Sequence, residues 1–180
     1  MMAAFLLLAS VVAYPFGVVA SLAITLGAMV LVNWWAPLFA DSGGNLPRWL
    51  YWAQTFDATL DAGWQDGYIA ATWGTPGWRR YLARVYWLYR NPCYALDYFV
   101  LGLPFDPSKW RVLRNVQTDT LSFFFAIGPA FNIEYAGRFG ELKLGWKAWN
   151  YWNASAWRTT PWGPSWRVPI CFTYTPFKRK

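Results

Sequence analysis

Residues 3–40 contain no Asp, Glu, Lys, Arg or His, and most of them are apolar. An apolar stretch of about 18 or more residues is typical of a helix that crosses a lipid bilayer. The stretch leads into Asn33-Trp34-Trp35, and indole rings favour the interface between membrane and water. The sequence therefore predicts that residues 1–40 form an apolar membrane anchor.

This anchor is longer than a single membrane crossing requires. A helix of this length would extend roughly 55–60 Å, whereas the hydrocarbon core measures about 30 Å. Pro15 lacks a backbone donor and Gly17 relaxes the backbone, so we expect a kink or break between Tyr14 and Gly17. Residues 18–36 are long enough to span alone. Residues 3–13 would then form a kinked extension, a re-entrant arm or a secretory signal region, and these three alternatives stay open.

The net charge of +7 is carried entirely by residues 41–180. Basic side chains gather at residues 79–90, 109–114 and 178–180, where they would attract anionic phospholipid headgroups. The positive-inside tendency then predicts that the segment after the anchor lies in the cytoplasm. Nucleic acid would also attract these charges, but the predicted membrane span disfavours it as a partner.

Residues 78–98 contain the pattern of a basic amphipathic helix, which Asn91-Pro92 should end. Such a helix can lie on a membrane surface with its rings in the lipid, or it can cover a β-sheet at the surface of the protein. Under the first interpretation, the membrane-interface residues are Trp34, Trp35, Arg79, Arg80, Arg84, Trp87 and Arg90.

The hydrophobic period changes to two residues after Ser122, which predicts β-strands. Four strands are expected, over residues 122–127, 131–136, 141–147 and 166–174, with one apolar face turned to the core. Pro169 lacks a ladder donor, so the last strand should lie at an edge or carry a bulge. The predicted fold class is α+β: an N-terminal transmembrane helix, amphipathic helices and a small antiparallel sheet.

Three segments follow from these patterns. Residues 1–40 form the anchor, with a span at about 18–36. Residues 41–77 form a Gly-rich connector with one short helix, which starts at Leu46-Pro47 and continues to about Leu60. Residues 78–180 form an α+β domain that lies against the membrane.

Residues suited to catalysis are scarce in this sequence. Histidine is absent, and with it the commonest general base. No P-loop, dinucleotide fingerprint or nucleophile elbow occurs. Asp57, Asp61 and Asp66 form the best acidic cluster, because a helix would bring Asp57 and Asp61 to one face and hard cations take carboxylate oxygens. Their spacing fits no EF-hand, and turn-forming roles are the more ordinary explanation of Asp61 and Asp66.

We therefore expect no cofactor, no bound metal and no enzymatic activity. A membrane-bound hydrolase that uses Asp57 and Asp61 is the enzymatic alternative. Cys93 and Cys171 form neither a disulfide framework nor a metal-binding spacing. They are either joined in one bridge or, more ordinarily, two reduced and buried thiols.

Several short motifs resemble a known family. They are WLYRNPCY at 87–94, LGWKAW at 144–149 and TPFK at 175–178, preceded by LPRWL at 46–50 and TFD at 55–57. In this order they resemble a family of small uncharacterised proteins encoded by tailed bacteriophages. The resemblance implies a phage origin and a place in the bacterial inner membrane, and it assigns no catalytic residue.

The expected function is that of a non-enzymatic phage accessory protein of the host inner membrane. Its partners would be a bilayer with anionic lipids and a host or phage membrane protein, in a role such as superinfection exclusion or envelope modification. A holin-like lysis protein is one alternative. A virion protein that enters the membrane during genome delivery is the other.

Overall fold

A computed structural model describes residues 2–62, 77–148, 158–160 and 163–178, and only the backbone of 158–160 and 163–165. These residues form an α+β fold with a long apolar helix, shorter helical segments and a small antiparallel sheet, as predicted. The chain divides into two compact units. Unit 1 comprises Met1–Ala20, Leu101–Trp157 and Trp166–Lys180, and unit 2 comprises Ser21–Val100 and Arg158–Ser165.

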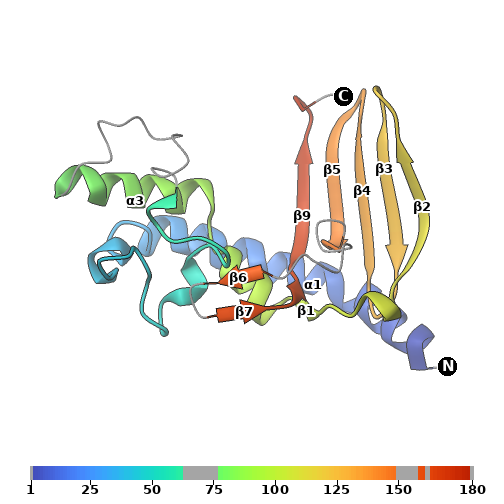
Figure 1. The fold of residues 1–180 in the computed structure, drawn as a ribbon, viewed down its shortest axis with the longest axis horizontal. Helices are drawn as coiled ribbons and strands as arrows, with labels where there is room; N and C mark the ends of the chain where they lie inside the picture. Colours follow the sequence, from blue (N-terminus) through green and yellow to red (C-terminus); the bar gives the residue numbers. More distant parts are fainter. Residues whose placement is uncertain (1, 63–76, 149–157, 161–162, 179–180) are drawn as a thin grey trace. The chain divides into compact units, whose positions relative to one another are not determined.

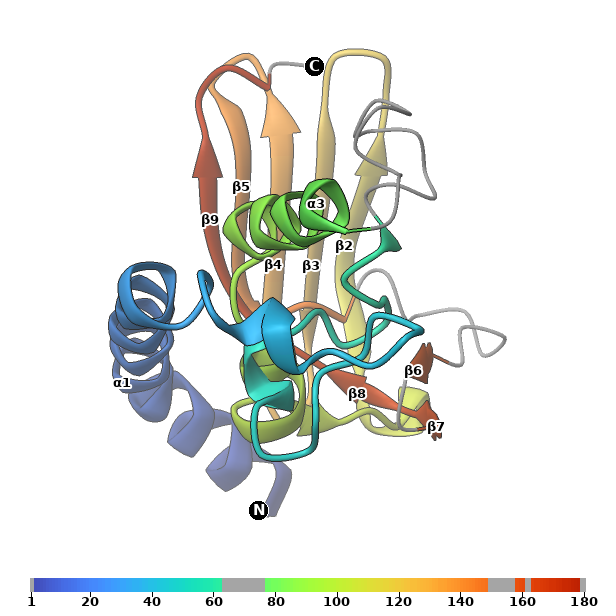
Figure 2. The same cartoon turned by 90° about the vertical axis from the view of Figure 1, so that its left-hand side faces the viewer.

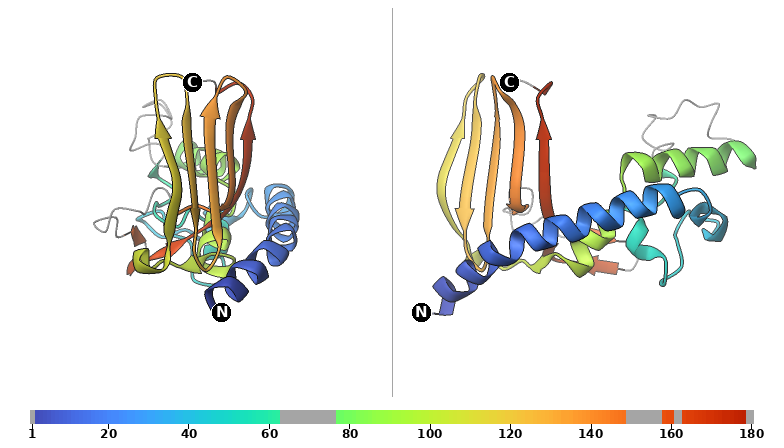
Figure 3. Two further views of the ribbon diagram at one scale, coloured as in Figure 1. Left: turned by 90° about the vertical axis from the view of Figure 1, so that its right-hand side faces the viewer. Right: turned by 180° about the vertical axis from the view of Figure 1, so that it is seen from behind.

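The N-terminal helix α1 runs from Met2 to Leu31 and contributes residues to both units. Pro15 lies within this helix, which Figure 3 shows as a helical ribbon. The alternative of a break is therefore wrong, because a proline removes only one donor of the helical ladder and the neighbouring turns continue, and the alternative of a kink stays a prediction. The helix is long and apolar enough to cross a membrane, and little of its apolar surface is buried.

Unit 1 is built on a five-stranded antiparallel sheet with the strand order β2-β3-β4-β5-β9, which Figure 1 shows side by side. Its strands are β2 Arg111–Gln117, β3 Ser122–Ile127, β4 Phe131–Gly137, β5 Gly140–Trp146 and β9 Ile170–Thr175. The last four confirm the predicted strands. The first was not predicted, because its charged and polar residues hide the alternation and a bulge lies between Val112 and Arg114.

Pro169 divides the predicted fourth strand into two parts. The residues before it form β8, Arg167–Val168, which pairs with β1, Leu103–Pro104. The residues after it form β9, which lies at one edge of the sheet, opposite the β2 edge, as Figure 2 also shows. The carbonyl of Pro169 still accepts a hydrogen bond from the backbone of Lys147 at 2.9 Å. The predicted edge position is confirmed, and Pro169, which lacks a ladder donor, lies between β8 and β9.

The burial of the side chains in β3 differs from the prediction. In β3, Phe124 and Ala126 are buried, whereas Phe123, Phe125 and Ile127 of the expected core face are only half-buried. The buried face continues in β4 with Asn132, whose side-chain oxygen accepts a hydrogen bond from the backbone of Ala148 at 3.0 Å. Because adjacent strand residues point to opposite faces, the face that carries Phe124 is the more buried one in β3, whereas Trp146 and Ile170 of the predicted core face are buried in β5 and β9.

Unit 2 is organised around helix α3, Trp78–Arg90, which ends before Asn91-Pro92 as predicted. Its core consists of apolar side chains from α3 and from loops: Ala36, Leu46, Leu50, Ala53, Leu60, Trp87 and Leu88. Further short elements are η1 Ala36–Phe39, η2 Tyr51–Ala53, the π-helical turn η4 Leu96–Val100 and the strand pair β6 Arg158–Thr160 and β7 Gly163–Ser165. In unit 1, a short turn η5, Pro107–Lys109, precedes β2.

The prediction of a helix from Leu46 to about Leu60 is wrong, since only the three-residue turn η2 forms there. The side chain of Gln54 explains the difference. Its oxygen accepts from the backbone of Leu46 at 2.7 Å, and its nitrogen donates to the carbonyl of Ala58 at 2.9 Å. The buried amide therefore links the backbone before η2 to the backbone after it, in a loop that is not helical.

Candidate functional site

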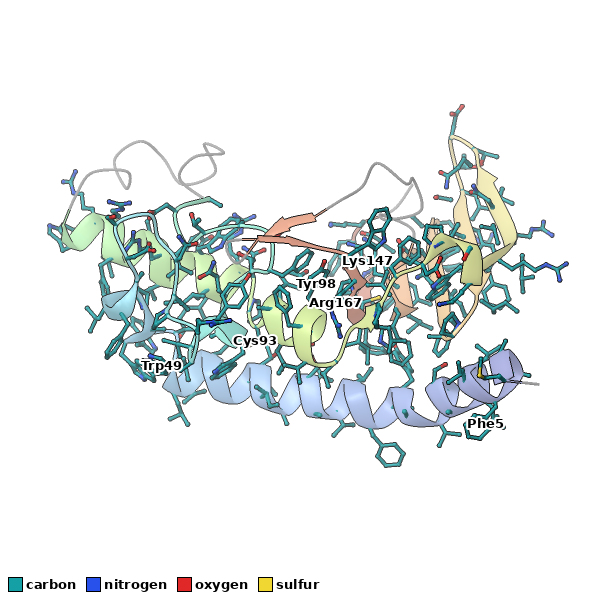
Figure 4. The ribbon with its side chains drawn as sticks, turned by 60° about the horizontal axis from the view of Figure 1, so that its bottom comes forward. Phe5, Trp49, Cys93, Tyr98, Lys147 and Arg167 are labelled. Carbon is teal, nitrogen blue, oxygen red and sulfur yellow. The ribbon has the colours of Figure 1, made fainter. Side chains whose placement is uncertain are left out.

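Helix α1 has two opposite faces with different surroundings. The outer face is apolar and exposed, and it consists of Phe5, Leu8, Val12, Phe16, Val19, Leu26 and Val30. Figure 4 shows the ring of Phe5 projecting from the helix. The inner face is buried or half-buried and consists of Ser10, Tyr14, Gly17, Ser21, Thr25 and Ala28. Both sets repeat at spacings of three and four, as one helical face does, except for a seven-residue step between Val19 and Leu26.

In unit 1, the inner face packs on the sheet. The Tyr14 hydroxyl donates to the carbonyl of Cys171 in β9 at 2.8 Å. The Tyr14 ring also meets Phe131 and Trp146, with centroid distances of 5.0 Å and 5.8 Å. A Cβ atom placed on Gly17 would lie 2.8 Å from Cδ1 of Ile170, so the small residue permits this approach. Strand side chains and strand backbone therefore lie directly against the middle of α1.

In unit 2, the inner face meets polar groups around the turn η4. The Ser21 hydroxyl donates to Oδ1 of Asp97 at 2.6 Å, and the side chain of Thr25 hydrogen-bonds the thiol of Cys93. The hydroxyl of Tyr89 in α3 donates to the carbonyl of Met29 at 2.6 Å. Each contact pairs the apolar helix with a polar or titratable group of unit 2.

Burial shifts two of these groups away from their charged forms. Desolvation raises the pKa of Asp97 to about 6, although the hydrogen bond from Ser21 opposes the shift. Desolvation likewise raises the pKa of Cys93 to about 11, against the hydrogen bond with Thr25 and with help from the charge of Asp97. The thiol of Cys93 therefore stays protonated near neutral pH, and both described cysteines are free.

An exposed aromatic cluster of unit 2 follows the C-terminal end of α1. Trp35, Phe39 and Trp49 form it, with ring centroids 5.5–6.3 Å apart, and all three rings are exposed. Trp34 lies beside Tyr89 at 5.7 Å, and its carbonyl accepts a hydrogen bond from Tyr81. Exposed indoles next to an apolar helix are typical of the membrane interface.

Asp61 is the centre of a buried ion cluster with two arginines of α3. Its carboxylate is 4% exposed and accepts from Nε and Nη2 of Arg84 at 2.7 Å and 2.8 Å. Arg80 donates to the same oxygens at 3.2 Å and 2.5 Å. The two guanidinium groups also donate to the carbonyls of Ser42 and Asp41. The cluster fastens α3 to the loop that follows α1.

This cluster leaves Asp61 unsuited to a metal ion or to acid–base chemistry. Burial alone would raise the pKa of Asp61, but the hydrogen bonds and charges of Arg84 and Arg80 outweigh burial and hold the pKa at about 2. Asp57 is exposed in a bend and does not share a helix with Asp61. Asp66 lies outside the described residues. Within the described ranges, no group of three acidic or cysteine side chains could hold a metal ion.

The structure separates the predicted membrane-interface residues into two groups. Trp34, Trp35, Arg79 and Arg90 are exposed. The side chains of Arg80 and Arg84 are 31% and 9% exposed and point to Asp61, and Trp87 is buried in the core. Arg84 and Trp87 are thus not available to lipid, because the polar stripe of α3 faces an acidic partner inside the protein.

Sequence reasoning missed the inner face of α1 and its partner Asp97. The signal was present in the sequence. Small or polar residues recur at positions 10, 14, 17, 21 and 25 of an otherwise apolar segment, which is the period of one helical face. Asp97 itself follows two apolar residues in a helical turn, and no local pattern distinguishes it from a solvated carboxylate.

The fold and this surface define a class: an α+β protein with a membrane-length apolar helix that packs by one face on its own chain. The chain belongs to a family of unknown function, DUF7338, whose model matches residues 6–180. No curated protein and no solved structure matches the chain.

Proposed function

We propose that this chain is a non-enzymatic, phage-encoded accessory protein that attaches to the inner membrane of a bacterial host and binds a lipid or membrane-protein partner there. The observation that carries the proposal is the outer face of α1. It presents large apolar side chains to the surroundings along a helix without a single charge. Removing so much apolar surface from water is strongly favourable, and a bilayer offers the matching environment.

Two further features support attachment to a membrane. The exposed rings of Trp35, Phe39 and Trp49 continue the apolar surface beyond the end of α1. Exposed arginines, among them Arg79 and Arg90, add positive charge that suits anionic headgroups. A phage origin is supported by the motif resemblance at residues 87–94 and 144–149. Superinfection exclusion and envelope modification are examples of the role that we propose.

A binding role is also supported by the chemistry of the acidic residues. Asp61 is neutralised by two arginines, and Asp97 is half-buried against a serine hydroxyl. Glu141 is paired with Lys143 and Lys178. Histidine, the other common general base, is absent from the sequence.

Expression of the full chain in bacterial cells tests the proposal. The protein should sediment with membranes after ultracentrifugation and should protect cells from phage without arresting growth. The double variant Phe16→Asp/Leu26→Asp, on the outer face, should lose both properties, whereas the exposed control Asp57→Asn should keep them. Full-length protein that stays in the supernatant would overturn the proposal. Loss of membrane potential would favour a holin-like protein, and detection in purified virions would favour a role in genome delivery.

A further inference from the structure

We infer that α1 lies flat in one leaflet of the membrane, with its outer face in the acyl chains, and does not cross the bilayer. The inference rests on the membrane attachment proposed above and specifies its geometry. The partner is the hydrocarbon of a single leaflet.

The first argument is where the contacts fall along the helix. A bilayer crossing needs about 20 residues. In a helix that runs from Met2 to Leu31, every window of about 20 residues contains positions 12–21. Tyr14, Gly17 and Ser21 would therefore lie within the hydrocarbon wherever the crossing was placed. These three residues are in contact with the folded body.

The second argument is what those residues touch. Tyr14 bonds the backbone carbonyl of Cys171 in the edge strand β9, and Ser21 bonds the carboxylate of Asp97. A crossing helix would carry a sheet edge and an acidic side chain into lipid. Open sheet edges are not found in lipid-exposed hydrocarbon, because their backbone groups lack partners there, and carboxylates are strongly disfavoured. A bilayer crossing by α1 is thus incompatible with its packing on β9 and on Asp97.

The third argument is that the two faces of α1 suit a flat position. Helices that lie in an interface usually carry a charged face toward the headgroups, and α1 has none. Its inner face is instead covered by the protein, through Ser10, Tyr14, Gly17, Ser21 and Thr25. Only the outer face needs an apolar environment, and a single leaflet supplies it.

Spin-label depth measurements test the orientation directly. The background is Cys171→Ser, since Cys93 is buried and its protonated thiol reacts slowly. Leu8→Cys, Phe16→Cys and Leu26→Cys each carry one label in vesicles of phosphatidylcholine and phosphatidylglycerol. A flat helix gives three similar depths, about 5–10 Å below the headgroups. A profile with position 16 near the bilayer centre and positions 8 and 26 in opposite leaflets would overturn the inference.

Labelling from the two sides of the membrane gives an independent result. Ala3→Cys on α1 and Asp119→Cys in the turn between β2 and β3 are both at exposed positions. In spheroplasts and in inverted vesicles, an impermeant maleimide should reach both from the same side. Reaction from opposite sides contradicts a flat helix.

Sedimentation with the same vesicles separates the two hypotheses. Full-length protein that does not bind vesicles overturns membrane attachment, and the orientation with it. Protein that binds vesicles but shows a crossing profile overturns the orientation alone. A soluble dimer that Phe16→Ser converts to a monomer would assign the outer face to a second copy of the chain and would also overturn the inference. Ser21→Ala, on the inner face, is the matched control and should still bind the vesicles.

Discussion

The Ser21 hydroxyl donates a hydrogen bond to Oδ1 of Asp97 at 2.6 Å, which joins an uncharged apolar helix to a titratable carboxyl group. Asp97 lies in the turn η4, directly before the buried Tyr98, whose ring stacks on Phe56 at a centroid distance of 4.1 Å. The protonation of one carboxyl group is therefore linked to the packing of α1 on unit 2.

Asp97→Asn should remove a pH dependence of stability. The pKa of Asp97 is raised from 3.8 to about 6 by burial, so the folded state favours the protonated group. Its contribution is fully present below pH 3.8 and is lost as the pH rises through about 6. A shift of about two units corresponds to at most about 3 kcal/mol. The neutral amide should keep that stability at pH 7.

Urea unfolding in mild detergent at pH 4–8, followed by Trp fluorescence, measures this effect. The wild type should lose stability between pH 4 and 7 relative to Asp97→Asn. The exposed control Asp57→Asn should follow the wild type. Parallel profiles for the wild type and Asp97→Asn would show that the carboxyl group is equally solvated in the folded and unfolded states.

Arg84→Met should destabilise the protein more than Arg80→Met. Arg84 is buried, and its removal leaves the buried carboxylate of Asp61 with one partner, at an expected loss of about 3 kcal/mol. Arg80 is partly exposed, so its loss should be nearer 1 kcal/mol. Chemical unfolding of both variants checks the order. A metal chelator should change neither midpoint, and a shift on chelation would restore the metal hypothesis for Asp61.

Acid should act on this cluster in the opposite sense to Asp97. The pKa of Asp61 is lowered from 3.8 to about 2, so its contribution to stability is present above pH 3.8 and is lost as the pH falls through about 2. Thermal unfolding of the wild type and of Asp61→Asn between pH 2 and 5 tests this. Their difference in midpoint should shrink toward the acidic end, and a constant difference would contradict it.

Gly17→Leu and Gly27→Leu form a matched pair on α1. A side chain at Gly17 meets Ile170 of β9, whereas no described atom outside the helix lies within 4 Å of a Cβ placed on Gly27. We expect Gly17→Leu to lower the free energy of unfolding by about 1–3 kcal/mol through overpacking. Gly27→Leu should be neutral or stabilise by up to about 1 kcal/mol, because glycine is a poor helix former. Circular dichroism melts of both variants measure the difference, and equal melting temperatures would show that α1 does not pack on the sheet.

Much of the fold could be predicted because its signals are local. Alternating side chains predicted β3, β4, β5 and β9, and Asn91-Pro92 predicted the end of α3. The errors occurred where a distant or single side chain decided the structure. The side chain of Gln54 hydrogen-bonds the loop where a helix was predicted, and β3 buries Phe124 and Ala126 while the residues of its predicted core face are half-buried.

One part of the candidate site could be predicted from the sequence, and the other part depends on a tertiary contact. The exposed apolar surface of α1 follows from residues 3–40 alone. The inward position of Arg84 does not, because basic side chains are normally solvated and Asp61, its partner, lies 23 residues earlier in an irregular loop. A buried ion pair is a tertiary contact, and no helical periodicity distinguishes it from a solvated basic face.

Cys93 should be nearly inert in the folded protein. It is buried, and desolvation raises the pKa of its thiol to about 11, so at pH 8 it should react with a disulfide reagent about 10²-fold more slowly than in the unfolded chain. Cys171 is only half-buried in β9 and should react first. A native protein should therefore show one reactive thiol and a urea-unfolded protein two. In Cys171→Ser, the fast phase should disappear and the single remaining thiol should appear only on unfolding. Rapid modification of Cys93 in this variant would contradict its burial in the folded protein.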